Sequence, residues 1–168
     1  MRFSLLIMAL LAAGWAFAQP DTTCACCSDP HRAFDFWLGE WVVKDTAGQV
    51  LGENTITVLE DGCLIAEYWR GAQGGTGRSY NYFDPADSTW HQLWVSSSGH
   101  ILRLQGRATP GQMVLTGSVK TGTKGPYRNR ITWTKQEDGT VVQQWDILTP
   151  DKQPIRTAFY GIYYPKSE

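Results

Sequence analysis

The sequence predicts an all-β fold: a single antiparallel up-and-down barrel of about ten strands with a short helical plug at its N-terminal end. The strand-forming runs lie at residues 40–44, 51–59, 63–69, 78–83, 89–96, 101–108, 113–120, 128–135, 140–148 and 156–164. Segments rich in Gly, Pro, Asp and Asn separate these runs, and most are of hairpin length. No segment between them is long enough for a crossover helix, so neighbouring strands should pair antiparallel. Closing the meander removes its exposed edges, which favours a barrel over an open sandwich.

The first 18 residues have the pattern of a signal peptide. Arg2 precedes an apolar run over residues 5–13, and Ala16-Phe17-Ala18 supplies the small residues of a cleavage site before Gln19. The alternative is a transmembrane anchor, but the run is shorter than the roughly 20 residues that cross a bilayer. We therefore expect cleavage near Ala18–Gln19 and a periplasmic or secreted protein. Residues 19–30 are expected to form a cysteine-containing tail, and residues 31–168 the barrel domain.

Composition excludes several classes of function. The chain has 168 residues, with 15 Lys and Arg against 16 Asp and Glu, for a formal net charge of −1. This balance gives no electrostatic footprint for nucleic acid, and the mature chain has no membrane-spanning segment. No motif for a phosphate, a nucleophile elbow or a catalytic zinc site is present, so no cofactor is expected. The oligomeric state is left open.

Four cysteines follow the leader: Cys24, Cys26, Cys27 and Cys63. An even number in an exported chain favours disulfides, and Cys63 should pair with one of the other three. The alternative is a metal site formed by the three clustered thiols with His31. That spacing is not a C-x-x-C knuckle, and export favours oxidation, so we expect the disulfide and no metal.

One helical segment precedes the strands. Asp29 can cap it, and Pro30 can occupy its first position. Phe34, Trp37 and Leu38 fall on one face, and the segment ends at Gly39.

Several strands alternate between two mixed faces rather than between an apolar and a charged face. Trp90, Gln92 and Trp94 share one face of their strand, while Arg103 lies opposite Leu102 and Leu104 on the next. A barrel that encloses a cavity tolerates aromatic and polar groups inside. The alternative is that the polar faces meet solvent and the Trp residues cover the outside.

The string Phe34-Asp35-Phe36-Trp37-Leu38-Gly39-Glu40-Trp41 resembles a group of exported, largely uncharacterised bacterial proteins that begin a calycin-like or lipocalin-like barrel with F-D-F-W-x-G-x-W. Asp61-Gly62-Cys63, Glu67 and Trp90-x-Gln92-x-Trp94 are also similar to that group. The resemblance implies that Gly39 and Trp41 close the barrel and that Arg156 of the last strand stacks across Trp41. Haem-binding relatives use a histidine on a late strand, and no histidine follows His100 here.

These observations predict a binding site inside the barrel for a small, partly apolar ligand with a polar or anionic group. The residues expected to contact it are Glu67, Tyr80, Trp94, Arg103 and Arg130, because Arg holds anions bidentately and aromatic rings bury the ligand body. An alternative is that Glu67 only pairs with Arg103 or Arg130. Two other functions remain open: a cofactor-free barrel enzyme using Glu67 or His91 as acid or base, and a structural envelope protein with a filled barrel.

Overall fold

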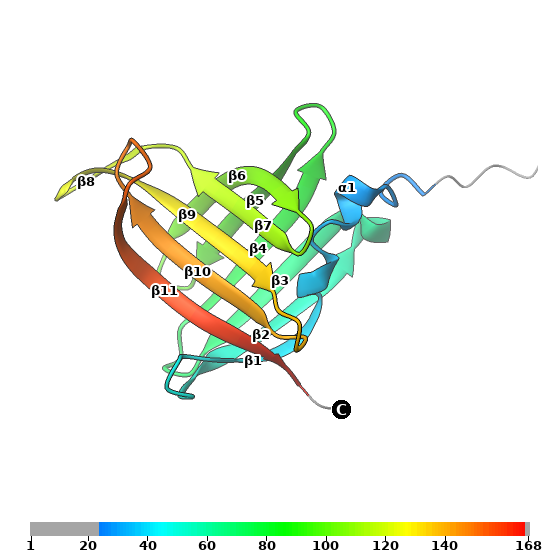
Figure 1. Cartoon of the computed structure of the whole chain (residues 1–168), viewed down its shortest axis with the longest axis horizontal. Helices are drawn as coiled ribbons and strands as arrows, with labels where there is room; N and C mark the ends of the chain where they lie inside the picture. The colour runs from blue at the N-terminus through cyan, green and yellow to red at the C-terminus, as the bar shows by residue number, and fades with distance from the viewer. Residues whose placement is uncertain (1–23, 167–168) are drawn as a thin grey trace, which may run out of the picture.

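The computed structural model describes residues 24–166 and contains a closed antiparallel barrel of ten strands (Figure 1). Strand β1 (Gly39–Lys44) is followed around the barrel by strands in chain order, and the last strand pairs with β1 to close it. The others are β2 (Val50–Leu59), β3 (Leu64–Gly71), β4 (Thr76–Asp84), β5 (Thr89–Ser96), β6 (Ile101–Thr109), β7 (Gln112–Gly117), β9 (Gly125–Lys135), β10 (Val141–Leu148) and β11 (Pro154–Pro165). The predicted fold class is confirmed. The expected signal peptide, residues 1–18, and the start of the expected tail lie outside the described residues.

One predicted strand is divided. The run at 113–120 ends as β7 at Gly117, and a separate short strand β8 (Lys120–Gly122) pairs with the beginning of β9. Gly122 and Gly125 flank a two-residue turn, and Gly125 has a φ of +104°, so the chain forms a local hairpin there. This hairpin projects from the end of the barrel opposite the N-terminal helix (Figure 1).

The predicted helical segment forms two short turns instead of one helix: α1 (Asp29–Arg32) and the 3₁₀ helix η1 (Asp35–Trp37). Phe34 lies between the two turns and Trp37 ends the second. Both side chains are fully buried, and their rings stack with centroids 4.9 Å apart. Phe34 also meets Trp90 and Trp133 edge-on. The segment therefore fills one end of the barrel with aromatic side chains, as a plug.

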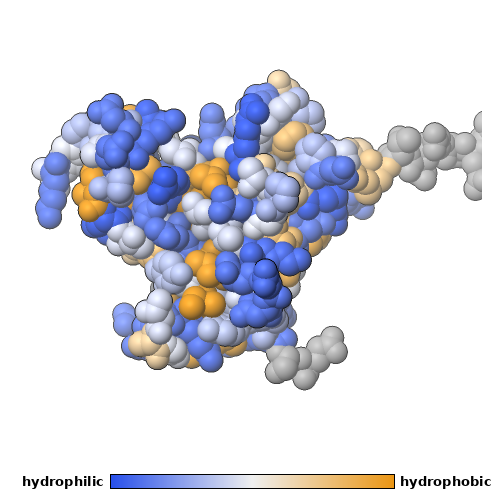
Figure 2. All heavy atoms as spheres, in the orientation of Figure 1, coloured by the Kyte–Doolittle hydropathy of each residue, from blue (hydrophilic) through white to orange (hydrophobic). Residues whose placement is uncertain are grey.

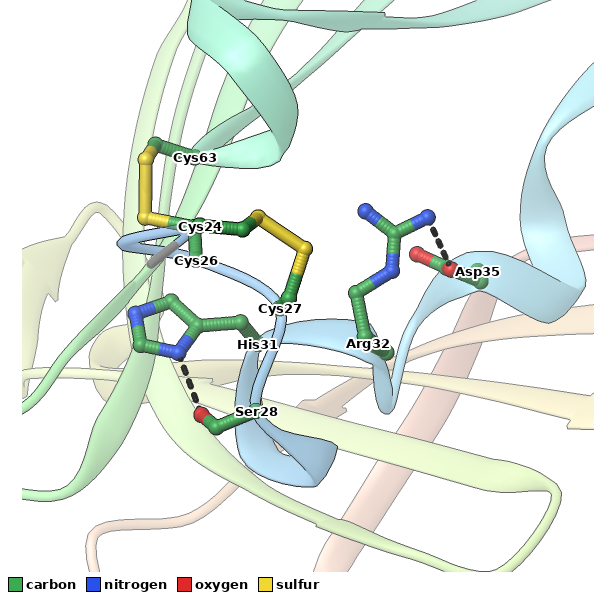
Figure 3. Close-up of a disulfide and its surroundings, with 8 residues drawn as sticks. All are labelled: Cys24, Cys26, Cys27, Ser28, His31, Arg32, Asp35 and Cys63. Carbon is green, nitrogen blue, oxygen red and sulfur yellow. Dashed lines mark hydrogen bonds and ion pairs between the residues drawn. A yellow bond between two sulfur atoms is a disulfide. The ribbon is translucent and has the colours of Figure 1, made fainter. Parts of the chain in front are cut away.

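The N-terminal residues contain two disulfides, and one of them ties this segment to the barrel (Figure 3). Cys63, at the start of the β3 hairpin, pairs with Cys26, one of the three partners that the sequence left open. The second bond joins Cys24 to Cys27. All four thiols are thus consumed, which leaves none for the metal-binding alternative. Among residues 24–166, no helix is long and apolar enough to cross a membrane.

Candidate functional site

The plug fills one end of the barrel, and a cavity of about 220 Å³ lies beyond it. Three strands show how the interior changes along the barrel axis. Reading away from the plug, the inward residues are Ile65, Glu67 and Trp69 on β3, and Trp90, Gln92 and Trp94 on β5; on β10 they are Val141, Gln143 and Trp145. Each strand therefore passes from the packed core, through one polar residue, to an aromatic ring at the cavity.

The cavity walls are mainly aromatic. We call Trp69, Trp94, Trp145 and Phe159 the aromatic wall; Leu102 and Ile131 complete the apolar lining. Glycines make room for these rings. A Cβ at Gly52 would lie 2.7 Å from the Trp69 ring, and one at Gly161 would lie 2.8 Å from the Phe159 ring. A Cβ at Gly77 would overlap three ring atoms of Trp94, which places the face of that indole over the glycine. The rings therefore line the barrel wall and leave the centre open.

A connected polar layer separates the cavity from the packed core; its members are Asn54, Glu67, Ser79, Asn81, Gln92, Gln143 and Tyr163. Glu67 is its centre. Asn54 Nδ2 donates to Glu67 Oε1 at 2.7 Å, and Ser79 Oγ donates to Glu67 Oε2 at 2.6 Å. Because each buried polar group would otherwise lose its hydrogen bonds to water, this network permits a carboxyl group inside the barrel.

Hydrogen bonds extend the polar layer to both sides of Glu67. Asn81 Nδ2 donates to Ser79 Oγ at 2.9 Å, and Gln92 Nε2 donates to Asn81 Oδ1 at 2.9 Å. On the other side, Asn54 Nδ2 also lies 3.3 Å from the Tyr163 hydroxyl, which donates to Gln143. The layer thus links strands from opposite parts of the barrel wall.

Glu67 is 6% exposed, and this burial raises the pKa of its carboxyl to about 7, although the hydrogen bonds from Ser79 and Asn54 oppose the rise. Burial, and secondarily the nearby Glu67 charge, also raises the pKa of Tyr163. These two are the only titratable groups among the described residues that line the cavity. No cationic side chain from the described part of the chain lines the cavity beside Glu67.

Two buried acceptors of the polar layer have no hydrogen-bond partner within the described part of the chain: Gln92 Oε1 and Asn54 Oδ1. Gln92 lines the cavity and is 4% exposed. Buried polar atoms are usually paired, so an open acceptor beside an open cavity indicates a place for a donor group.

An outer hollow of about 540 Å³ adjoins the cavity at Trp145, which lines both. The β8–β9 hairpin and the beginning of β11 form its rim, with exposed Lys124 and Arg156. The His100 ring stacks on Trp145 with centroids 5.9 Å apart. Trp145 therefore borders both spaces, at the end of the barrel away from the plug.

The five residues predicted to contact a ligand divide between the two sides of the barrel wall. Glu67 and Trp94 line the cavity. The prediction that Tyr80, Arg103 and Arg130 also point inward is wrong. Tyr80 is 48% exposed, Arg103 is exposed, and Arg130 forms an ion pair with Asp146 at 2.8 Å on the outer face.

The reason is the side-chain alternation of strands. Leu102 and Leu104 pair with Trp94 and Gln92, so they point inward and the intervening Arg103 points outward. Neither arginine can then reach Glu67, which also removes the predicted alternative of an internal Glu–Arg bridge.

The outward arginines border a separate open groove of about 920 Å³ across the outer faces of β5 to β10. Arg103, Arg128, Arg130 and Lys152 contribute to it, together with Leu93 and Val114. Over the face drawn in Figure 2, hydrophilic side chains dominate and apolar ones gather only in small separate areas. The groove is a surface feature outside the barrel interior, lined by both cationic and apolar side chains.

Of the expected closure residues, Gly39 and Trp41 lie at the plugged end. Trp41 is buried, its Nε1 donates to the Trp37 carbonyl at 2.9 Å, and Gly39 adopts a φ of +127° beside the Trp41 ring. The expectation for Arg156 is wrong. Trp41 pairs with Pro165 at the end of β11, whereas Arg156 lies near the beginning of that twelve-residue strand, at the opposite end of the barrel. Tyr163 meets the Trp41 ring instead.

His91, the other predicted acid or base, faces outward. Its ring stacks on Tyr82, and its Nε2 lies 3.0 Å from Asp87 Oδ2. Among the described residues, Asp84, Asp87 and His91 have the spacing of metal ligands. Both carboxylates also accept hydrogen bonds within the turn: Asp84 from the Ala86 amide, and Asp87 from the Thr89 amide and hydroxyl. These turn contacts explain the positions of the two aspartates without a metal ion. Because His91 lies on the outer face and Glu67 lines the cavity, the two side chains cannot act on one substrate inside the barrel.

No protein-family model matches the chain, and no curated protein matches it. Sequence reasoning missed most of the polar layer, since Asn54, Ser79 and Tyr163 stand in strands with no distinctive pattern. The W-x-Q-x-W spacing around Gln92, and its shorter echo Gln143-x-Trp145, were the available signals.

Proposed function

We propose that this protein is an exported, lipocalin-like barrel that binds a small, partly apolar molecule in its interior cavity. The ligand body packs against the aromatic wall, and its polar group meets the polar layer at Glu67. The supporting observation is the incompletely filled interior: a buried hydrogen-bonded carboxyl group faces an aromatic cavity that lies beyond the plug. Small-molecule sites typically combine apolar walls with a few directed polar groups.

Export is part of the same proposal. It rests on the leader-like residues 1–18, on the resemblance of residues 34–41 to exported calycin-like barrels, and on the two disulfides. A purely structural role for a filled barrel agrees less well with the open centre that the wall glycines maintain.

A matched pair of substitutions tests the site. Leu102→Phe adds a ring inside the cavity, while Leu93→Phe makes the same change on the outer face of the neighbouring strand. A library of small apolar compounds with one polar group is screened by intrinsic Trp fluorescence. We expect ligands whose affinity falls at least about tenfold in Leu102→Phe and stays within about twofold in Leu93→Phe. A library without binders, or equal losses in both variants, contradicts the proposal.

The second candidate is a cofactor-free enzyme in which Glu67 transfers a proton. A carboxyl group with a pKa of about 7 is suited to give and accept protons near neutral pH. Ligands found in the screen are incubated with the protein and followed by mass spectrometry. Turnover that Glu67→Gln abolishes supports the enzyme, and unchanged ligand supports the binding protein.

A further inference from the structure

The open positions of the polar layer accept hydrogen bonds rather than donate them. Gln92 gives its Nε2 to Asn81, and its Oε1 has no partner among the described residues. The two carboxylate oxygens of Glu67 can together accept about four hydrogen bonds, and they receive two. A ligand group that meets this layer therefore gains most if it is a donor.

The aromatic wall offers ring faces to the same space. Trp94 lies with one indole face against Gly77, so its other face is turned to the cavity. Trp145 is held in position by a hydrogen bond from its Nε1 to Asn129 Oδ1 at 2.9 Å. Phe159 meets Trp69 edge-on with centroids 6.0 Å apart. Indole faces attract cations through the ring quadrupole, and the attraction strengthens when water is excluded.

The charge balance points the same way. Within residues 24–166, the polar groups around Glu67 are neutral: Asn54 from β2, Ser79 from β4, Gln92 from β5 and Gln143 from β10, with Tyr163 from β11. A buried carboxylate without a cation is costly, and a cationic ligand removes that cost. Lys124 and Arg156 lie on the exposed outer rim, where solvent screens them.

We propose that the cavity selects an organic ammonium ion, a primary amine with a compact apolar body. The ammonium group donates to Glu67 and Gln92, and the body packs among Trp69, Trp94 and Trp145. This proposal rests on the proposed function, because it names the ligand class of that cavity. Binding stabilises the ionised carboxyl group, so the empty site gives up its proton when the amine enters at acidic pH.

The test compares phenethylammonium with 2-phenylethanol, a neutral molecule of nearly the same size and shape. Affinities are measured by Trp fluorescence and calorimetry on the disulfide-bonded protein. At about pH 7.5 we expect the amine to bind at least about tenfold more tightly than the alcohol. Glu67→Gln should lower amine affinity at least about tenfold, and by a larger factor than it lowers alcohol affinity, because only the amine loses an opposite charge. The exposed turn variant Glu137→Gln should leave both affinities unchanged.

A measurement on the wild-type protein keeps the proposal testable even if Glu67→Gln does not fold. Calorimetry at about pH 6, in buffers of different ionisation enthalpy, should show release of close to one proton per bound amine. Equal affinity for amine and alcohol, or binding without proton release, overturns the ammonium proposal but leaves cavity binding in place. Failure of both compounds to bind also overturns it, while the neutral-compound screen with Leu102→Phe decides separately whether the cavity binds ligands.

Discussion

Replacing Glu67 by glutamine should change how the stability of the barrel depends on pH. Burial raises the pKa of Glu67 from its ordinary 4.5 to about 7 in the folded protein. Below about pH 4.5 the group is protonated in both the folded and unfolded chains, and it adds no cost. As pH rises toward 7, only the unfolded chain loses the proton, so the free energy of unfolding falls. Above about pH 7 the loss is complete.

The size of the effect follows from the two pKa values. A difference between 4.5 and about 7 corresponds to about 3 kcal/mol at 25 °C. The amide of Glu67→Gln has the same shape and no charge, so this pH-dependent loss disappears. The stability of the variant relative to wild type should therefore rise by about 3 kcal/mol between about pH 4 and about pH 8. At about pH 4 the variant should be less stable than wild type by about 1 kcal/mol, because the Ser79 hydroxyl loses its carboxyl acceptor.

Urea unfolding at several pH values, followed by Trp fluorescence with both disulfides intact, measures this difference. All other titrating groups are common to both proteins and cancel. Glu137→Gln, in the exposed turn after β9, controls for the loss of any one carboxylate and should show a nearly constant difference. If the free energies of unfolding of Glu67→Gln and wild type differ by a constant amount, within about 0.5 kcal/mol, at every pH, the reasoning that burial raises the pKa of Glu67 is refuted.

Three further predictions concern the plug, the wall and the disulfides. Trp41→Ala should lower the free energy of unfolding by roughly 3–5 kcal/mol and by more than Trp94→Ala, because Trp41 is buried whereas Trp94 is only partly buried beside the cavity; equal losses in urea unfolding would contradict this. Gly77→Ala should push the Trp94 ring into the cavity, shift the emission spectrum and weaken binding of any cavity ligand; an unchanged spectrum and affinity would be inconsistent with the close packing. Cys63→Ser opens a disulfide that spans 37 residues and should cost about 4 kcal/mol, whereas Cys24→Ser opens one that spans 3 and should cost about 1.5 kcal/mol; thermal unfolding that ranks them in reverse would contradict the chain-entropy argument.

Local chemistry was enough to predict the ten barrel strands, apart from the separation of β8 from β7, and the order of their pairing. Turn residues such as Glu137-Asp138-Gly139 bend the chain back over a few residues, and consecutive strands joined this way become neighbours. Alternation also separated the two faces of each strand correctly: Trp90, Gln92 and Trp94 do share one face, and Arg103 does oppose Leu102. These properties depend on residues close together in the chain.

Only the tertiary structure decided which face points inward, because period-two alternation labels two faces without saying which is enclosed. On β6 the inward residues are leucines, while on β5 they include Gln92, so neither polarity nor aromatic content identifies the interior strand by strand. The polar layer likewise joins Asn54 to Tyr163 across 109 positions of sequence, through the closure of β11 onto β1. Closure also sets Arg156 at the far end from Trp41. The sequence by itself thus determined the strands, their faces and their order. The interior site depends on the tertiary structure, because the pairing of β11 with β1 closes the barrel and the aromatic plug fills one end, which leaves the cavity at the other.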